Sequence, residues 1–104
     1  MTTYAHEFLV AVLIYRCNQR NEPIWYGKIV ELLKDKLGKN EISHAMDTLA
    51  DWMIAYGKYG PTENGRVGYC WYIDDDIEPI IRDMSERMGR EKNGLDGAVY
   101  GKTE

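Results

Sequence analysis

The pattern of apolar positions begins with an almost unbroken run, "FLVAVLIY", at residues 8–15. This run allows either a helix or a buried strand. The flanks "YAHE" and "RCNQR" are compatible with a helix, so we predict one over residues 4–19. A helix that is apolar on every side is buried on every side. Because a domain of this size seldom buries its first helix completely, we expect part of that helix to face a second copy of the chain.

Two shorter helical patterns follow a polar turn. Pro23 ends the first segment, and the stretch "PIW" can form a short strand. Residues 26–37 carry apolar side chains at the spacing of one helix face, and Gly38 is a natural stop for that helix. A third helix is expected to begin at Asn40, which is a good N-cap residue. Its core face recurs at helical spacing, at Ile42, Met46, Leu49 and Met53.

An alternating pattern then predicts a β-hairpin around the loop "GPTENG" at residues 60–65. We expect Ile54 opposite Trp71, Tyr56 opposite Tyr69 and Lys58 opposite Val67, all on one face. Cross-strand pairs of aromatic and β-branched residues stabilise a hairpin by ~0.2–1 kcal/mol each. In this register the base of the hairpin covers the core, and the loop forms its outer end.

The run "DDDIEP" predicts the start of a last helix, because aspartate caps helices and proline is tolerated in their first turn. Its apolar stripe consists of Ile77, Ile80, Ile81, Met84 and Met88. The helix is expected to end near Gly89. Residues 91–104 show no periodicity, so we predict one domain over residues 1–90 and a disordered tail over 91–104.

Composition and charge limit the classes of protein that the chain can belong to. A length of 104 residues suits one domain. The longest apolar run is far shorter than the ~20 residues that cross a membrane, and no signal peptide is recognisable, so we expect a cytoplasmic protein without a membrane partner. The net charge is −4, but residues 74–104 carry nine acidic and five basic residues. The middle of the chain is therefore close to neutral and can present a basic face.

No pattern in the sequence indicates catalysis. The chain lacks the glycine-rich phosphate loops, the nucleophile elbow and the paired-histidine zinc motif. His6 and His44 have no partners at metal-ligand spacing, and the three consecutive aspartates are better explained as helix caps than as a metal site. Cys17 and Cys70 suit two reduced thiols rather than a disulfide framework. We therefore predict no enzyme, no cofactor and no metal.

The order of these elements resembles a winged helix-turn-helix domain. The resemblance covers residues 4–73 and rests on "IVELLKDKLGKNEISHAMDTLADWMIAYGKYG" followed by "GRVGYCWYI". It implies a mainly α fold with a small β-hairpin, namely a three-helix core, a wing hairpin and an additional carboxyl-terminal helix. The shape is similar to small dimeric regulators of the PadR or MarR type. In such families a glycine usually precedes the wing and the wing tip is usually basic, whereas here "DWMIA" precedes it and Glu63 lies in the tip.

The resemblance also implies roles for individual residues. The third helix would enter the major groove of DNA, with candidate contacts at Asn40, Ser43, His44, Asp47 and Thr48. Phosphates or the minor groove would meet the turn and the wing, at Lys34, Lys36, Lys39, Lys58, Tyr59 and Arg66. The first and last helices would form the dimer interface, at Phe8, Val12, Tyr15, Ile77, Ile81, Met84 and Met88.

The leading hypothesis is a homodimeric DNA-binding winged helix protein, a transcriptional regulator whose partner is double-stranded DNA. The alternative is a winged helix that binds another protein, which the acidic total, Asp47 and Asp51 favour. A third hypothesis is a repressor that responds to a small-molecule effector in a pocket lined by tryptophan and tyrosine. A continuous positive stripe across the turn and the wing separates the first hypothesis from the second.

Overall fold

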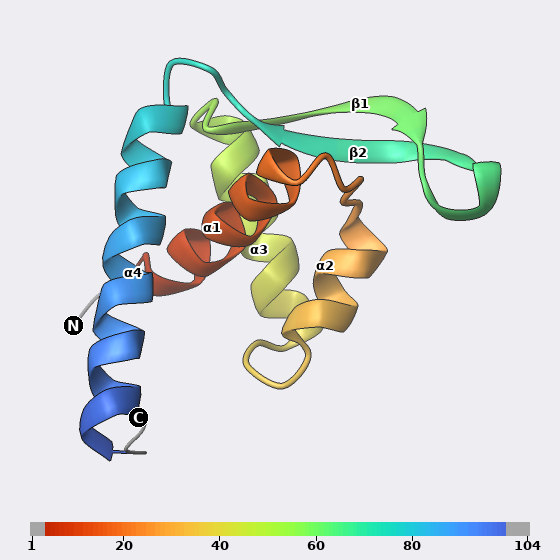
Figure 1. The fold of residues 1–104 in the computed structure, drawn as a ribbon. Coiled ribbons are helices and arrows are strands. Elements are labelled where there is room, and N and C mark those ends of the chain that lie inside the picture. The colour runs from red at the N-terminus through yellow and green to blue at the C-terminus, as the bar shows by residue number, and fades with distance from the viewer. Residues whose placement is uncertain (1–3, 100–104) are drawn as a thin grey trace.

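The computed structural model describes the backbone of residues 4–99 and the side chains of residues 4–88 apart from Asn64. It is a winged helix, mainly α with a two-stranded antiparallel sheet (Figure 1). The elements follow in the order α1 (Ala5–Gln19), α2 (Tyr26–Leu33), α3 (Lys39–Asp51), β1 (Ala55–Pro61), a short 3-10 turn (Glu63–Gly65), β2 (Val67–Ile73) and α4 (Glu78–Val99). None of the helices described is long and apolar enough to cross a membrane.

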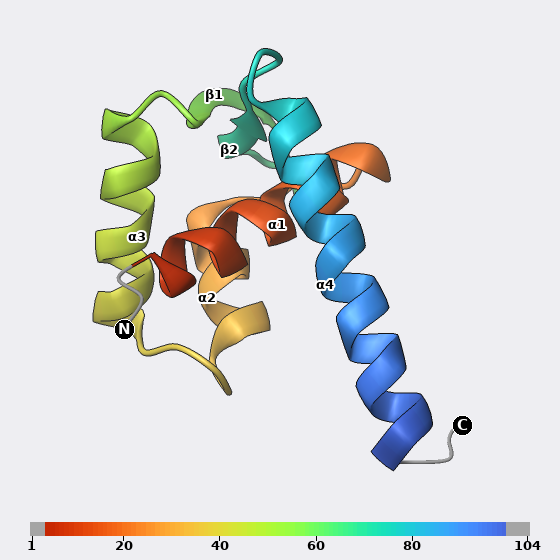
Figure 2. The ribbon, with the colours of Figure 1, turned by 90° about the vertical axis from the view of Figure 1, so that its left-hand side faces the viewer.

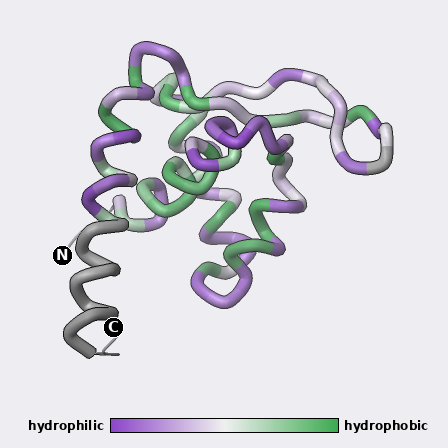
Figure 3. Tube along the Cα trace, in the orientation of Figure 1, coloured by the Kyte–Doolittle hydropathy of each residue, from purple (hydrophilic) through white to green (hydrophobic). Residues whose placement is uncertain are grey.

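Helix α1 forms the centre of the domain, which rules out the alternative of a buried strand over residues 8–15. It packs against α3, α4 and β2 (Figure 2). Val10 and Ile14 are completely buried, whereas Phe8 keeps 44% of its surface exposed. Figure 3 shows that α1, in the middle of the molecule, is largely apolar, whereas the turn that joins α2 to α3 is largely hydrophilic. The expectation of a largely buried first helix is therefore confirmed, and its exposed residues lie toward both ends.

The turn between α2 and α3 is longer than the sequence predicts. Helix α2 ends at Leu33, whose carbonyl accepts amide hydrogens from Lys36 and Leu37, both at 2.8 Å. Helix α3 begins at Lys39 with Gly38 as its N-cap, so the expected cap at Asn40 is wrong. The amide of Gly38 donates to Oε1 of Glu41 at 2.8 Å. This bond satisfies one of the backbone donors that a helix start leaves free.

The end of α3 replaces the usual glycine by a methionine in the left-handed region. The amide of Ile54 donates to the carbonyl of Leu49 at 2.9 Å, and that of Met53 donates to Ala50 at 3.1 Å. This pair of bonds closes a helix with a left-handed residue at the first position beyond the cap, and Met53 has a φ of 60° there. The end of α1 uses the same device, with Asn21 at a φ of 57°.

Met53→Gly is therefore expected to stabilise the protein by about 0.5–1 kcal/mol. A side chain in the left-handed region costs ~1–2 kcal/mol, and the greater freedom of glycine in the unfolded chain offsets part of the gain. Met53 is 77% exposed, so its removal leaves no cavity. Urea denaturation of Met53→Gly and of Asn21→Gly tests this. Asparagine tolerates the left-handed region, so an equal gain in both variants would contradict the explanation.

The hairpin has a different register from the predicted one. Tyr56 pairs with Tyr72, Gly57 with Trp71 and Tyr59 with Tyr69, a shift of three residues. The predicted pairs Ile54–Trp71, Tyr56–Tyr69 and Lys58–Val67 are therefore wrong. The pair Ala55 and Ile73 is buried at the base of the hairpin, whereas Tyr56 and Tyr69 are exposed. An odd shift turns every side chain of one strand to the opposite face, which explains the change.

Strand β2 is held on its other side by the segment before α2 and by α1. Trp25 forms an isolated bridge with Cys70, and the amide of Trp71 donates to the carbonyl of Ile24 at 2.8 Å. The short strand expected in "PIW" is thus present as one bridge. Asn18 of α1 donates to the carbonyl of Trp71 at 3.2 Å and accepts from the amide of Ile73 at 3.0 Å. These bonds connect β2 to the core helix.

Helix α4 continues to Val99, beyond the stop expected at Gly89. Its first half is attached to α1 by Arg16, which donates to Oγ of Ser85 at 2.8 Å and to the Ser85 carbonyl at 3.1 Å. Residues 91–99 of the predicted tail therefore lie within a helix, and residues 100–104 lie outside the described residues. The domain boundary near residue 90 remains a prediction.

Candidate nucleic-acid interface

The exposed face of α3 carries the five residues that the sequence singles out for DNA contact. Asn40, His44 and Asp47 are exposed, and Ser43 and Thr48 are half-buried. The opposite face is buried in the core through Ile42, Ala45, Met46 and Leu49. The hydroxyl of Thr48 already donates to the carbonyl of His44 at 3.1 Å. The Thr48 hydroxyl can therefore still accept a hydrogen bond from a ligand. The side chains of His44 and Ser43 can each donate or accept one.

Three lysines project from the turn next to this face. Lys34, Lys36 and Lys39 are all exposed. Lys39 is the first residue of α3, where the positive end of the helix dipole disfavours a cation. A residue that breaks a local rule without an evident gain in stability points to a functional position.

The positive residues of the turn and the wing are not neutralised by neighbouring carboxylates. The ion pairs among the described residues are His6–Glu41, Arg20–Glu22, Arg82–Glu78 and Arg87–Asp83. Within that part of the chain, no ion pair involves the candidate phosphate contacts Lys34, Lys36, Lys39, Lys58 and Arg66. Arg82 and Arg87 on α4 are paired, whereas these five candidate phosphate contacts are available for an anion.

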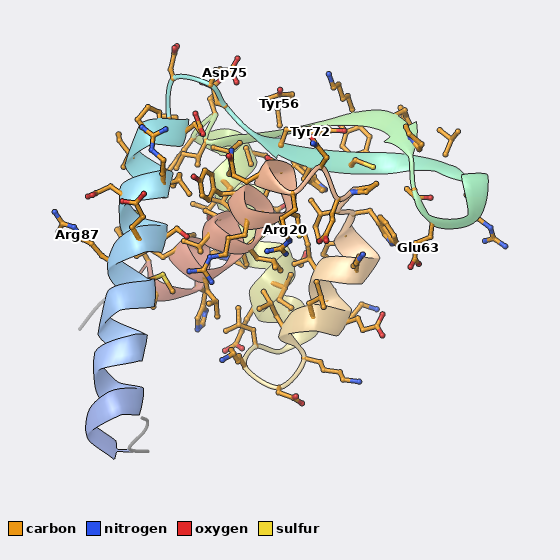
Figure 4. The ribbon with its side chains drawn as sticks, in the orientation of Figure 1. Arg20, Tyr56, Glu63, Tyr72, Asp75 and Arg87 are labelled. Atoms are coloured by element: carbon orange, nitrogen blue, oxygen red, sulfur yellow. The ribbon has the colours of Figure 1, made fainter. Side chains whose placement is uncertain are left out.

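Acidic residues are distributed over both ends of the molecule. Asp47 and Asp51 lie exposed on α3, and Glu63 lies in the turn at the wing tip. Figure 4 shows Glu63 at that tip and Asp75 at the opposite end of the hairpin. The exposed face of α3 therefore carries carboxylates as well as the candidate DNA contacts.

The wing differs from the expected core-covering sheet because exposed aromatic rings lie on both of its faces, Tyr59 and Tyr69 on one and Tyr56 on the other. Tyr59 and Tyr69 meet edge to face with ring centroids 5.1 Å apart, and Tyr69 meets Trp71 in the same way at 5.5 Å. On the other face Tyr56 stacks on Tyr72 at 5.7 Å. Tyr59 is thus confirmed as a surface residue of the wing. Tyr69 and Trp71 were expected to cover the core from the base of the hairpin. Trp71 is half-buried against the core, whereas Tyr69 is exposed.

The expected dimer interface is only partly open to a partner. Val12, Tyr15 and Ile81 are buried in the core of the chain itself, which removes them from any surface. The exposed apolar residues nearby are Phe8 on α1 and Ile80 on α4, with half-buried Ile77, Met84 and Met88 beside them. Ile80 belongs to the predicted stripe of α4 but not to the predicted interface.

An apolar groove of about 310 Å³ lies between α1, the end of α3 and the start of α4. Phe8, Trp52 and Ile80 contribute to its walls. Glu7 also lines the groove and is buried, and its Oε1 has no hydrogen-bond partner among the residues that the structure describes. A buried carboxylate oxygen without a hydrogen bond costs free energy. Within the described part of the single chain, nothing offsets that cost for Glu7.

The two cysteines are buried and carry no sign of reactivity. Burial raises the pKa of both the Cys17 and the Cys70 thiols above the ordinary value. A raised pKa lowers the fraction of thiolate, which is the reactive form. Among the residues described, no group of three or more histidine, cysteine, aspartate or glutamate side chains could hold a metal ion.

Comparisons with known proteins bear on the fold. No model of a protein family matches the sequence, and no curated protein matches it significantly. Among solved structures, the chain is similar to the circadian clock associated protein Pex from Anabaena, with a TM-score of 0.61 and 14% identity over 95% of this chain and 84% of that one. It is also similar to Pex from Synechococcus sp. (strain PCC 7942), with a TM-score of 0.54 and 20% identity over 80% of each chain. At these identities the likeness shows a shared fold.

Proposed function

We propose that the protein is a winged helix regulator that binds double-stranded DNA through α3, the α2–α3 turn and the wing. The observation that carries this proposal is the set of exposed cations on the α2–α3 turn and the wing, none paired with a described carboxylate. Unpaired lysines and arginines next to an exposed helix supply the phosphate contacts that position such a helix in the major groove. The likeness to the clock-associated Pex proteins is consistent with a regulatory role. A closer relation to PadR-type or MarR-type regulators is part of the same proposal.

Within this proposal, α3 supplies the base contacts and the lysines supply the phosphate contacts. His44 and Ser43 can donate to or accept from base edges. Asp47 can accept from a cytosine amino group, which would give it a selective role rather than a general one. Lys34, Lys36 and Lys39 fit the phosphates beside the major groove, and Lys58 and Arg66 fit those beside the wing.

A salt series of binding to duplex DNA of mixed sequence tests this proposal. Each phosphate contact releases counterions, so the logarithm of the binding constant should fall with the logarithm of salt concentration with a slope of about −0.9 per contact. Five cations per chain therefore give a slope of about −4 to −5 for one chain. Fluorescence anisotropy with a labelled duplex measures it. No binding at ~50 mM salt, where non-specific binders hold DNA, would falsify the proposal.

We also propose that two copies associate through the apolar groove between α1, α3 and α4. Phe8, Trp52 and Ile80 are each close to half exposed in the single chain, and contiguous exposed apolar surface of this kind marks association sites. A second copy would exclude water from the groove and could bring a hydrogen-bond donor to Glu7. Two copies would present two α3 helices to successive major-groove segments, so the expected DNA site is a pseudo-palindrome.

The double substitution Phe8→Glu with Ile80→Glu is expected to convert this dimer into a monomer. Two charges placed in a buried apolar seam without partners cost several kcal/mol, enough to raise the dissociation constant by on the order of a thousandfold. Analytical ultracentrifugation at micromolar concentration measures the mass. Val67→Glu, at an exposed apolar position on the wing and away from the groove, serves as the control and should stay dimeric. A monomeric unsubstituted protein at that concentration would disprove the dimer.

A further inference from the structure

We infer that the aromatic face of the wing binds unpaired nucleobases by stacking, so that the protein prefers DNA with a locally opened segment to fully paired duplex. The aromatic face consists of Tyr59, Val67, Tyr69 and Trp71. This inference rests on the proposed DNA-binding function and adds to it the state of the DNA that is bound. The proposed phosphate contacts of the wing and base contacts of α3 could form with fully paired duplex and do not depend on stacking.

The exposure of this face is not explained by folding. The hairpin register places Ala55, Gly57, Tyr59 and Pro61 on the same face as Val67, Tyr69, Trp71 and Ile73. At the base of the hairpin this face enters the core through Ala55 and Ile73, which are buried. Farther out Tyr59 is 76% exposed and Val67 is 72% exposed. Side chains this exposed recover little hydrophobic free energy on folding, so the apolar row continues well beyond what the core uses.

The rings of this face are held in place before any ligand arrives. A Cβ atom at Gly57 would lie 2.2 Å from Cε2 of Tyr69, which means that the Tyr69 ring covers the bare backbone of Gly57. Trp71 and Tyr59 both contact the Tyr69 ring through the two edge-to-face contacts described above. Tyr59 is the outermost and most exposed ring of the row. A ring that is already oriented loses little conformational entropy on binding.

The charges near the face indicate what kind of molecule it fits. Arg66 precedes β2 directly beside Val67, and it is exposed with no ion pair among the described residues. Lys58, next to Tyr59 in β1, has Nζ 5.3 Å from the Tyr72 ring centroid, on the opposite face of the hairpin. Arg66 is therefore the cation beside the aromatic face, and Lys58 lies on the reverse side of the same hairpin. Aromatic rings on a hairpin that also carries these cations suit a ligand that combines flat rings with negative charge. A nucleotide strand has both features, with bases for the rings and phosphates for the cations.

Fully paired DNA does not offer its base faces, because each base is stacked on its neighbours. An opened segment exposes them, and one base stacked on an aromatic side chain contributes ~1–3 kcal/mol. The wing tip also carries Glu63, which opposes a purely electrostatic approach to phosphate. Stacking provides binding free energy that does not depend on the weak net charge of the tip.

Two labelled probes of equal length and composition test the inference, one fully paired and one with a central run of mismatched pairs. The full chain should bind the opened probe about tenfold more tightly at the same salt concentration. Tyr59→Ala should remove that preference, because it should weaken binding of the opened probe about tenfold more than binding of the paired duplex. Tyr59→Phe should keep the preference. Tyr56→Ala, on the opposite face, serves as the matched control and should keep the preference. Circular dichroism melting establishes that each variant folds.

A 2-aminopurine base placed in the opened segment gives an independent readout of stacking. Its fluorescence should fall when the protein binds and should not fall with Tyr59→Ala. Equal affinity for both probes, an equal loss for both with Tyr59→Ala, or an unchanged 2-aminopurine signal would each overturn the inference. Failure to bind paired duplex, together with binding of the opened probe that depends on Tyr59, would instead overturn the duplex-binding proposal and retain this one. If neither probe is bound, both proposals are wrong.

Discussion

A chain that carries both Lys34→Glu and Lys39→Glu is expected to bind duplex DNA on the order of a hundredfold more weakly while it remains folded. The two substitutions remove two proposed phosphate contacts and place two carboxylates against the same phosphates. Loss of the two contacts alone should make the slope of log binding constant against log salt concentration shallower by about two. Fluorescence anisotropy over a salt series measures both the affinity and the slope. A binding constant within about threefold of the unsubstituted chain would show that the turn does not contact DNA.

The structure allows loss of binding to be distinguished from loss of folding in this variant. A glutamate at the first position of α3 interacts favourably with the helix dipole, where the natural Lys39 does not. Lys39→Glu alone is thus expected to raise stability by about 0.3–1 kcal/mol. A variant that is more stable and yet binds DNA poorly cannot owe its defect to unfolding.

A matched control addresses the general effect of charge. Arg82→Glu with Arg87→Glu changes the net charge by the same amount, on α4 rather than at the turn. Arg87 pairs with Asp83 at 3.1 Å and Arg82 lies 4.0 Å from Glu78, so both cations are already engaged within the helix. Figure 4 places Arg87 on the outer side of α4, away from the wing. If this control weakened DNA binding as strongly as the turn variant, net charge rather than the proposed contacts would explain the effect.

Asn18→Ala is expected to destabilise the fold by about 2–4 kcal/mol, the largest effect on stability of any single polar substitution that we propose. The substitution leaves the carbonyl of Trp71 and the amide of Ile73 without their partner in a partly buried place. Each buried backbone group left unpaired costs about 1–3 kcal/mol. For a domain of this size the loss corresponds to a fall in melting temperature of roughly 10–20 °C.

Gln19→Ala provides the control for this prediction, because Gln19 is adjacent in sequence but makes only an exposed bond, from Nε2 to Glu78 at 3.1 Å. Its expected cost is below about 0.5 kcal/mol. Thermal and urea denaturation of the two variants measure the difference. Equal stability of the two would mean that water replaces the Asn18 amide at no cost, and that β2 is held by its other contacts.

Much of the fold could be predicted because its signals are local. The stripes of α2 and α3, the polar turn between them and the apolar run of α1 depend on contacts three or four residues apart, and those determine helices directly. The order of elements then indicates the winged helix. The candidate readers on α3 could be placed for the same reason, since Ile42, Met46 and Leu49 define which face is buried and therefore which face is free.

The sequence by itself determined the helices, the presence of a hairpin and the face of α3 that meets solvent. Only the tertiary structure decided how the hairpin pairs. In β2 the alternate residues Val67, Tyr69, Trp71 and Ile73 are all apolar, so the sequence shows which face of that strand is the apolar one. In the first half of the hairpin Ile54 and Tyr56 are bulkier than Ala55 and Gly57, which favoured the wrong set. The small residues face the rings because Tyr69 requires the space above Gly57, and because Asn18 fixes β2 against α1 from a distant part of the chain. Both are contacts between residues far apart in sequence, which periodicity cannot report.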